Sequence, residues 1–256
     1  MFNTFHASGV VRMNVLVTGS NGFIARNLIQ KLGANSSLQV LTQSSRDTEH
    51  DLFKKLNKSD FVFHLAGVNR SKNELDFKLA NVELTKSITE YLKFTGKLLP
   101  IIFSSSTQAG LDNIYGRTKA EAESLLIDYV NFAKGKARIY RLPNVFGKWS
   151  RPDYNSVIAT FCFRIAKDLE VMMPNPEAKL RLVYVADVVT AFIEDLQFDS
   201  TFGFLGEVSP VFETTVGEVH SIIKRFKDQI IDDEYPKDQQ QLRNYLKETY
   251  IYFSTQ

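Results

Sequence analysis

The sequence predicts an α/β fold, a doubly wound parallel sheet with a small C-terminal lobe that binds the substrate. Three observations indicate this class. A glycine-rich turn follows a short apolar strand near the N-terminus, strand and helix patterns then alternate, and a Tyr-x-x-x-Lys motif follows a serine run. Such alternation is typical of a parallel sheet covered by helices on both faces. The chain of 256 residues is long enough for one such domain and a lobe built from its later segments.

The first strand is Met13–Val17, a short apolar run that indicates a strand buried inside a parallel sheet. It leads into Gly19-x-x-Gly22-x-x-Ala25 and a predicted helix over Phe23–Leu32. Gly19 permits the tight turn, Gly22 lets the backbone approach a pyrophosphate, and the helix N-terminus supplies donors for its oxygens. We therefore predict a Rossmann-type dinucleotide site. Its first contacts are Gly19, Asn21, Gly22, Phe23 and Ile24.

The later elements continue this alternation. Further strands are predicted at Leu38–Leu41, Phe61–Leu65, Leu99–Phe103, Arg138–Leu142 and Leu182–Val185, and helices at Glu74–Lys93, Tyr115–Ala133, Val157–Lys167 and Val219–Phe226. Thr215 and Glu218 form a capping-box pattern before the last of these helices. Ligands on such sheets bind at the carboxyl ends of the strands. Further cofactor contacts are predicted there, at Leu65, Ala66, Gly67, Ser104 and Leu142.

Tyr115 and Lys119 carry the candidate chemistry. Residues four apart share one face of a helix, so the Lys119 ammonium can lie beside the Tyr115 phenol. A nearby cation favours the phenolate and draws the pKa of a tyrosine down from its ordinary value of about 10. Such a phenol can exchange a proton with a carbonyl or alcohol oxygen. The alternative is an ordinary solvated helix face, but the glycine turn and the serine run favour the catalytic interpretation.

The form of the cofactor depends on the end of the second strand. An acidic residue there would bind the ribose 2′-hydroxyl and repel a 2′-phosphate. The segment 42–46 carries no acid before Asp47 and includes Arg46, whose guanidinium suits a phosphate. Arg26, early in the first helix, is a second candidate, and either arginine could instead be solvated. We predict NADPH as the cofactor.

Several short stretches together resemble one family. The glycine turn, the run 64–67 (His-Leu-Ala-Gly), the serine run 104–106, Tyr-x-x-x-Lys and the run 184–188 (Tyr-Val-Ala-Asp-Val) resemble the motifs of extended short-chain dehydrogenases/reductases. Two runs are more specific, 143–149 (Pro-Asn-Val-Phe-Gly-Lys-Trp) and 154–162 (Tyr-Asn-Ser-Val-Ile-Ala-Thr-Phe-Cys). With them, residues 13–256 resemble the reductase domain of the CapF (WbjC) family of bifunctional capsular-polysaccharide enzymes.

The resemblance implies a reaction and a role for each matching residue. Reductase domains of that family use NADPH to reduce the 4-keto group of a UDP-2-acetamido-2,6-dideoxy-hexos-4-ulose. The product is UDP-2-acetamido-2,6-dideoxy-L-talose, on the way to UDP-N-acetyl-L-fucosamine for capsule or O-antigen. Tyr115 would protonate the C4 oxygen, and Lys119 would bond the nicotinamide ribose. Ser106 aligns with the active-site serine and would polarise the carbonyl, although Ser104 or Ser105 could do so instead. Substrate contacts are implied at Ser105, Thr107, Asn144, Lys148, Arg151, Tyr154 and Asn155.

The resemblance also bears on partners. Family members carry a zinc-dependent C-terminal cupin domain for the preceding epimerisation, whereas this sequence ends at Gln256. Its four His and one Cys form no cluster with metal-ligand spacing, so we expect no metal and no epimerase site. Two protein partners are compatible with the sequence: a separate cupin epimerase and a second copy in a homodimer. The aromatic residues Tyr245, Tyr250, Tyr252 and Phe253 could leave an apolar patch that promotes such association.

Composition argues against several other function classes. A net charge of +2 argues against a nucleic-acid partner, and no apolar stretch approaches the length of about 20 residues that a membrane helix needs. A single cysteine forbids an internal disulfide framework and suits the cytoplasm. We expect residues 1–12 to be a disordered extension. Residues 13–256 would form one domain, with a substrate lobe built mainly from 143–180 and 200–256.

Two other functions remain open. A sugar-nucleotide epimerase or 4,6-dehydratase of the same superfamily would hold NAD tightly and return the hydride to its own substrate. Dehydratases generally place an acid and a base next to the serine, whereas this chain has Thr107-Gln108 there. A non-enzymatic cofactor-binding regulator usually lacks the tyrosine or the lysine, and this chain keeps both. The favoured prediction is therefore an NADPH-dependent sugar-nucleotide ketoreductase.

Overall fold

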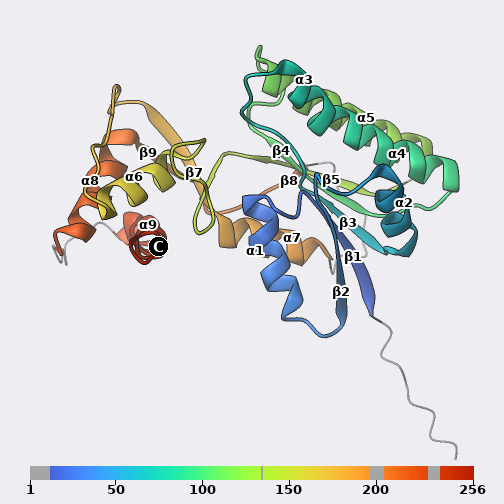
Figure 1. Cartoon of the computed structure of the whole chain (residues 1–256), viewed down its shortest axis with the longest axis horizontal. Helices are drawn as coiled ribbons and strands as arrows, with labels where there is room; N and C mark the ends of the chain where they lie inside the picture. Colours follow the sequence, from blue (N-terminus) through green and yellow to red (C-terminus); the bar gives the residue numbers. More distant parts are fainter. Residues whose placement is uncertain (1–11, 134, 197–204, 230–236) are drawn as a thin grey trace, which may run out of the picture.

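The protein is described by a computed structural model that covers residues 12–133, 135–196, 205–229 and 237–256. The predicted N-terminal extension lies, apart from its last residue, outside the described residues. Among the described residues, two sheets and the helices packed on them form the fold (Figure 1).

The larger sheet has six parallel strands. They are β1 (Met13–Thr18), β2 (Leu38–Gln43), β3 (Phe61–His64), β4 (Ile101–Ser106), β5 (Ala137–Leu142) and β8 (Leu205–Gly206). Their order in space is β2-β1-β3-β4-β5-β8, and every pair is parallel. The strands β3 and β4 are buried throughout, as expected when helices cover both faces of a sheet. The predicted α/β class is confirmed.

Helices cover both faces of this sheet. On one side lie α1 (Phe23–Gly33) and α7 (Val185–Leu196), and on the other α2 (Glu49–Lys58), α4 (Leu84–Thr95) and α5 (Ile114–Ala133) (Figure 1). Side chains of β1 alternate between the two cores: Val15 and Val17 pack on the α1 side, and Leu16 packs on the α4 side. This period of two is the ordinary geometry of a strand.

The predicted helix over Glu74–Lys93 consists of three segments. These are α3 (Glu74–Phe77), a π-helical segment η1 (Lys78–Glu83) and α4. The π turn carries Asn81, which is fully buried and exchanges hydrogen bonds with the backbone of Val68 in the loop after β3. Asn81 also donates to the Thr118 hydroxyl on α5. Because π turns recur at functional sites, the loop after β3 that Asn81 holds is a candidate part of such a site.

The sheet creates a crevice between β1 and β3. From β1 the chain passes to β2 on one side and later to β3 and β4 on the other, which is the arrangement that opens a ligand site beyond the carboxyl ends of the strands. Gly19 turns there with a φ of +67°, and a Cβ on it would lie 2.6 Å from the Cα of Ala66. Only glycine suits both the positive φ and this close approach.

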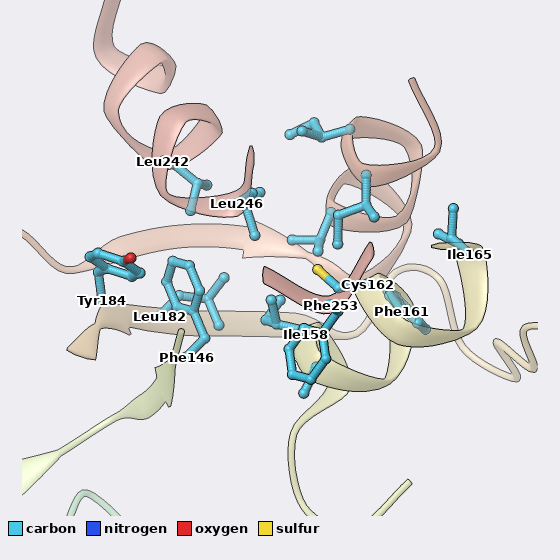
Figure 2. Packing of buried hydrophobic residues seen from close by; sticks show 14 of the residues in the cluster. Phe146, Ile158, Phe161, Cys162, Ile165, Leu182, Tyr184, Leu242, Leu246 and Phe253 are labelled. Carbon is cyan, nitrogen blue, oxygen red and sulfur yellow. The ribbon is translucent and has the colours of Figure 1, made fainter. Parts of the chain in front are cut away.

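The smaller sheet belongs to a second lobe. Its strands β6 (Asn144–Phe146), β7 (Lys179–Tyr184) and β9 (Phe212–Thr215) lie beside α6 (Val157–Ala166), α8 (Val216–Lys227) and α9 (Lys237–Ser254). These elements share a core of their own, in which Phe146, Phe161, Leu182, Leu246 and Phe253 meet (Figure 2).

Three expectations change in this region. The strand predicted at Leu182–Val185 is β7, which pairs with β6 and β9 rather than with the main sheet, and Val185 begins α7. The main sheet also includes β8, which lies in the segment 200–256 that we expect to belong mainly to the lobe. Residues 200–204 lie outside the described part of the chain.

The predicted aromatic patch near the C-terminus is wrong. Tyr245 stacks on Tyr184 with ring centroids 4.1 Å apart, and Phe253 is buried in the core of the lobe. Tyr250 and Tyr252 pack against the same core. These rings therefore fill the lobe, and the expected homodimer loses the support that they would have given. The capping box of Thr215 and Glu218 at the start of α8 is confirmed.

Candidate active site

A cleft of about 1140 Å³ lies between the carboxyl edge of the main sheet and the second lobe. Its walls come from the β1–α1 turn, the loop after β3, the end of β4, the start of α5 and the segment 142–158. Four cationic side chains line it: Arg26, Arg70, Lys119 and Arg151. Among the described residues, no Asp or Glu does. The cleft is therefore suited to anionic ligands.

The three predicted catalytic residues meet in this cleft. Tyr115 lies in the first turn of α5, and its phenol forms a hydrogen bond with the hydroxyl of Ser106 at the end of β4. Lys119 follows one helical turn later, and its ammonium donates to the Ser104 carbonyl at 2.9 Å. The ammonium also lies 4.6 Å from the centre of the Phe103 ring. One strand end and one helix thus hold the phenol, a hydroxyl and a cation together.

The hydroxyls of Ser105 and Ser106 have different partners. The Ser105 hydroxyl donates to Glu123, which also receives two guanidinium nitrogens of Arg141, at 2.6 Å from Nη2 and at 3.0 Å from Nε. Successive strand residues point to opposite faces, so the Ser105 hydroxyl reaches Glu123 further along α5, while Ser106, at the strand end, meets the Tyr115 phenol in the first turn of that helix. Ser105 lines the cleft, but its hydroxyl is engaged with Glu123, so its substrate contact stays a prediction.

Burial governs the ionisation of the pair. Burial raises the pKa of the Tyr115 phenol above its ordinary value, and the hydrogen bond with Ser106 opposes that rise. Burial lowers the pKa of Lys119 to about 8, while the carboxylate of Glu123 opposes that fall. The expectation that Lys119 draws the pKa of Tyr115 toward neutrality is therefore not met. The phenol keeps its proton at neutral pH, which is the form that a proton donor requires.

His64 lies close to this site without facing it. It is fully buried, and its two ring nitrogens form hydrogen bonds of 2.8 Å with the hydroxyls of Thr18 and Thr85. Burial, aided by the nearby Lys119 charge, lowers the pKa of His64 to about 3. A neutral imidazole held at both nitrogens is a structural residue here.

Most of the predicted dinucleotide contacts line the cleft. They are Asn21, Gly22, Phe23, Ile24, Leu65, Gly67, Ser104 and Leu142. Gly19 and Ala66 lie behind them and shape the turn through their close approach. Gly22 caps α1 without a side-chain hydrogen bond, so the first amides of the helix remain open to an anion. These features fit the pyrophosphate of a dinucleotide.

The two candidate 2′-phosphate arginines differ in position. Arg26 lines the cleft, and its guanidinium lies 4.7 Å over the Trp149 ring. Arg46 is exposed outside the cleft, shortly after β2, whose end contacts the glycine turn through a bond from the Ser20 N–H to the Gln43 carbonyl.

The acid next to Arg46 is already engaged. The Ser44 N–H and hydroxyl donate to Asp47, which also pairs with Lys55 at 3.1 Å. Mainly through the Ser44 N–H bond, these contacts lower the pKa of Asp47 to about 2. The carboxylate is held within its own turn rather than presented to a ribose.

The predicted substrate contacts divide into two groups. Ser105, Asn144, Arg151, Tyr154 and Asn155 line the cleft. Thr107 is exposed outside it.

Lys148 also points elsewhere. Its ammonium donates to Gln30 on α1 at 2.6 Å and lies 4.5 Å over the Trp149 ring. The structure therefore does not support Thr107 or Lys148 as substrate contacts. The next residue, Trp149, has a φ of +68°, so the backbone turns directly after the lysine that reaches α1.

Several cleft residues were not predicted from the sequence. Arg70 comes from the loop after β3, Trp149 and Gln108 from loops after β6 and β4, and Tyr252 from the end of α9. Arg70 could have been found as a cation shortly after the carboxyl end of a buried strand. Tyr252 gave no such signal, because α9 reaches the cleft only through the packing of the lobe.

Within the described ranges, no group of three or more His, Cys, Asp or Glu side chains could hold a metal ion. In the same residues, no helix is both long and apolar enough to cross a membrane.

Comparison with known proteins identifies the family of this chain. Residues 15–201 match the NAD dependent epimerase/dehydratase family. The chain is 39% identical over 215 residues to a Pseudomonas aeruginosa protein named UDP-2-acetamido-2,6-beta-L-arabino-hexul-4-ose reductase. That alignment covers 84% of this chain and 58% of the relative.

Solved structures share the fold of this chain. The capsular polysaccharide assembling protein CapF from Staphylococcus aureus superposes with a TM-score of 0.83 at 35% identity, over 94% of this chain and 66% of that one. A UDP-glucuronic acid 4-epimerase from Bacillus cereus in complex with NAD superposes with a TM-score of 0.80 over 95% of this chain and 99% of that one. At 19% identity this likeness concerns the fold alone. The chain thus spans about three-fifths of the length of its more similar relatives.

Proposed function

We propose, because the chain belongs to the NAD dependent epimerase/dehydratase family, that it is a ketoreductase of UDP-linked hexuloses. Its specific reaction would be the NADPH-dependent reduction of UDP-2-acetamido-2,6-dideoxy-hexos-4-ulose at C4. The product would be UDP-2-acetamido-2,6-dideoxy-L-talose, a step toward UDP-N-acetyl-L-fucosamine for capsule or O-antigen. The name of the Pseudomonas aeruginosa relative supports this choice of substrate.

The observation that carries the proposal is the meeting of Tyr115, Ser106 and Lys119 in a cleft lined by cations. A carbonyl oxygen placed between the phenol and the Ser106 hydroxyl would receive hydrogen bonds from both, which stabilise the charge that develops on it. Tyr115 would then give its proton to that oxygen. The Lys119 ammonium, one turn away, would stabilise the phenolate that remains. A bound reduced nicotinamide would supply the hydride.

The composition of the cleft bears on the alternatives. A 4,6-dehydratase would need an acid and a base beside the serine, and the neighbours of Ser106 are Thr107 and Gln108. No carboxylate among the described residues lines the cleft. An epimerase that returns its hydride would use the same three residues, so the two activities are separated by whether reduced cofactor is consumed.

The decisive experiment mixes purified protein, NADPH and the 4-keto sugar made from UDP-N-acetylglucosamine, with and without a separate cupin domain. We expect absorbance of the reduced nicotinamide to fall in step with formation of the 6-deoxy-talose product. Tyr115→Phe keeps the ring and removes the proton, so it should reduce kcat by about 10²–10⁴. A variant that keeps more than a tenth of the wild-type rate, or no NADPH oxidation in either mixture, would refute the assignment.

We also propose a preference for NADPH over NADH. It is supported by Arg46 after β2 and by the engagement of Asp47 with Ser44 and Lys55. Arg46→Ala should raise the KM for NADPH about 10-fold and leave the KM for NADH unchanged, since a charge-assisted bond to phosphate contributes about 1.5–3 kcal/mol. Arg26→Ala tests the other arginine in the same assay. A wild-type protein that prefers NADH at equal concentration would contradict the proposal.

The single cysteine, Cys162, is buried in the lobe and suits a reducing compartment, so we place the protein in the cytoplasm. A separate cupin epimerase would supply the keto sugar in the required configuration. A homodimer is proposed without a defined surface.

A further inference from the structure

Two loops on opposite walls of the cleft are joined by a reciprocal pair of hydrogen bonds. The Arg70 guanidinium donates to the backbone carbonyl of Tyr154, and the Tyr154 hydroxyl donates to the backbone carbonyl of Arg70 at 2.6 Å. Arg70 follows β3 in the main sheet, whereas Tyr154 belongs to the segment that precedes α6 in the lobe. Both side chains line the cleft.

A second guanidinium lies on the same tyrosine. Arg151 is placed over the Tyr154 ring, 4.7 Å from its centre, and it also lines the cleft. Among the described residues, neither Arg70 nor Arg151 forms an ion pair, in contrast to Arg164 and Arg181 of the same lobe. Two cations are thus gathered around one tyrosine in a cleft where no described carboxylate offsets them.

The segment that carries Arg151 and Tyr154 is anchored at its start as well. Asn27 on α1 donates to the Lys148 carbonyl at 3.1 Å, and the Ser150 hydroxyl donates to the Gly147 carbonyl at 2.6 Å. The segment is therefore held to α1 at one end and to Arg70 at the other. Side chains held in this way lose little freedom when they bind a ligand.

We propose that Arg70 and Arg151 form a clamp for the diphosphate of a nucleoside-diphosphate sugar, with Tyr154 as its spacer. This inference rests on the proposed function and adds Arg70 to it. A guanidinium has five N–H donors, and the bond to the Tyr154 carbonyl engages Nη1 of Arg70. The remaining donors suit the paired oxygens of a phosphate.

The proposed clamp lies at a different place in the cleft from the predicted dinucleotide site. A dinucleotide pyrophosphate binds at the glycine turn and the N-terminus of α1, where Arg26 is the cation that lines the cleft. Arg70 and Arg151 lie instead on the loop after β3 and on the lobe segment. The two anionic ligands would therefore use different arginines.

The test measures binding rather than turnover. Calorimetry would give the Kd of UDP and of uridine, in the presence of NADPH, for the wild type, Arg70→Gln, Arg151→Gln and the double variant. Loss of one charge-assisted contact should weaken UDP binding about 10-fold, and the double variant about 100-fold. Uridine binding and the Kd of NADPH should not change. Arg181→Gln, an exposed lobe arginine outside the cleft, is the matched control and should bind UDP as the wild type does.

Each outcome decides the point. UDP affinity that is unaffected by the substitutions, or a wild type that does not bind UDP, would overturn the clamp. Equal weakening of UDP and uridine would also overturn it, because the arginines would then act only on the shape of the site. If the keto sugar is not reduced but UDP binding depends on both arginines, the clamp stands and the proposed reaction falls.

Discussion

Glu123 is the residue on which the charge of Lys119 depends. It lies one turn further along α5, it is 4% exposed, and it accepts hydrogen bonds from Ser105 on β4 and Arg141 on β5. Burial lowers the pKa of Lys119 to about 8, and the negative charge of Glu123 opposes that fall because it stabilises the ammonium. Glu123 is therefore a positioning residue, which acts on the reaction through Lys119.

This predicts a change in pH dependence. Reductase activity should fall as the pH rises above about 8, because Lys119 then loses its proton. Removing the carboxylate lowers the pKa further, so in Glu123→Gln this alkaline limb should move to lower pH by about one unit, the size of effect expected from one nearby opposite charge. The measurement is kcat/KM for the keto sugar from neutral to alkaline pH.

A matched control lies on the same helix. Glu121 is exposed and not engaged with Lys119, so Glu121→Gln should leave the profile unchanged. If Glu123→Gln lowers activity equally at every pH, the network with Ser105 and Arg141 serves only the packing of α5.

Among the elements of the lobe, α9 contributes three buried side chains to the shared core. Leu246 is fully buried, and with Leu242 and Phe253 it joins α9 to α6 and α8 in the core of the lobe (Figure 2). The helix is therefore part of the lobe core, and its last turn brings Tyr252 to the cleft.

A cavity at this position should be costly. Leu246→Ala is expected to lower the free energy of unfolding by about 2–5 kcal/mol, as buried leucine truncations do. Denaturant unfolding followed by intrinsic fluorescence would measure it. The exposed neighbour Lys247, changed to Ala, should stay within about 0.5 kcal/mol of the wild type. A Leu246→Ala variant as stable as the wild type would show that the Leu246 side chain does not stabilise the lobe.

Elements with a strong local pattern were predictable from the sequence. Met13–Val17 and the helix after it were found because an apolar run, a glycine turn and a helical period follow one another. The sheet to which β7 belongs was not, because apolar periodicity marks a buried strand without naming its neighbours. The π turn at Asn81 was also missed, since propensity does not distinguish it from an α-helix.

At the scale of the whole molecule, the candidate active site also combines residues that local sequence links with residues that only the fold brings together. Tyr115 and Lys119 could be paired from the sequence because one helical turn joins them. The choice of Ser106 over Ser105 needed the register of β4 against α5, and the directions of Thr107 and Lys148 needed the loops themselves. Arg70 and Tyr154 are 84 residues apart, so only the folded chain brings them together.

The charge of the cleft has a practical consequence for anyone who purifies this protein. A cleft lined by Arg26, Arg70, Lys119 and Arg151, with no carboxylate among its described lining residues, will also attract small inorganic anions. Phosphate or sulfate in a buffer would compete with each nucleotide for the guanidinium groups that bind it. Affinities taken in such buffers would come out too weak, and zwitterionic buffers at low ionic strength are the appropriate choice.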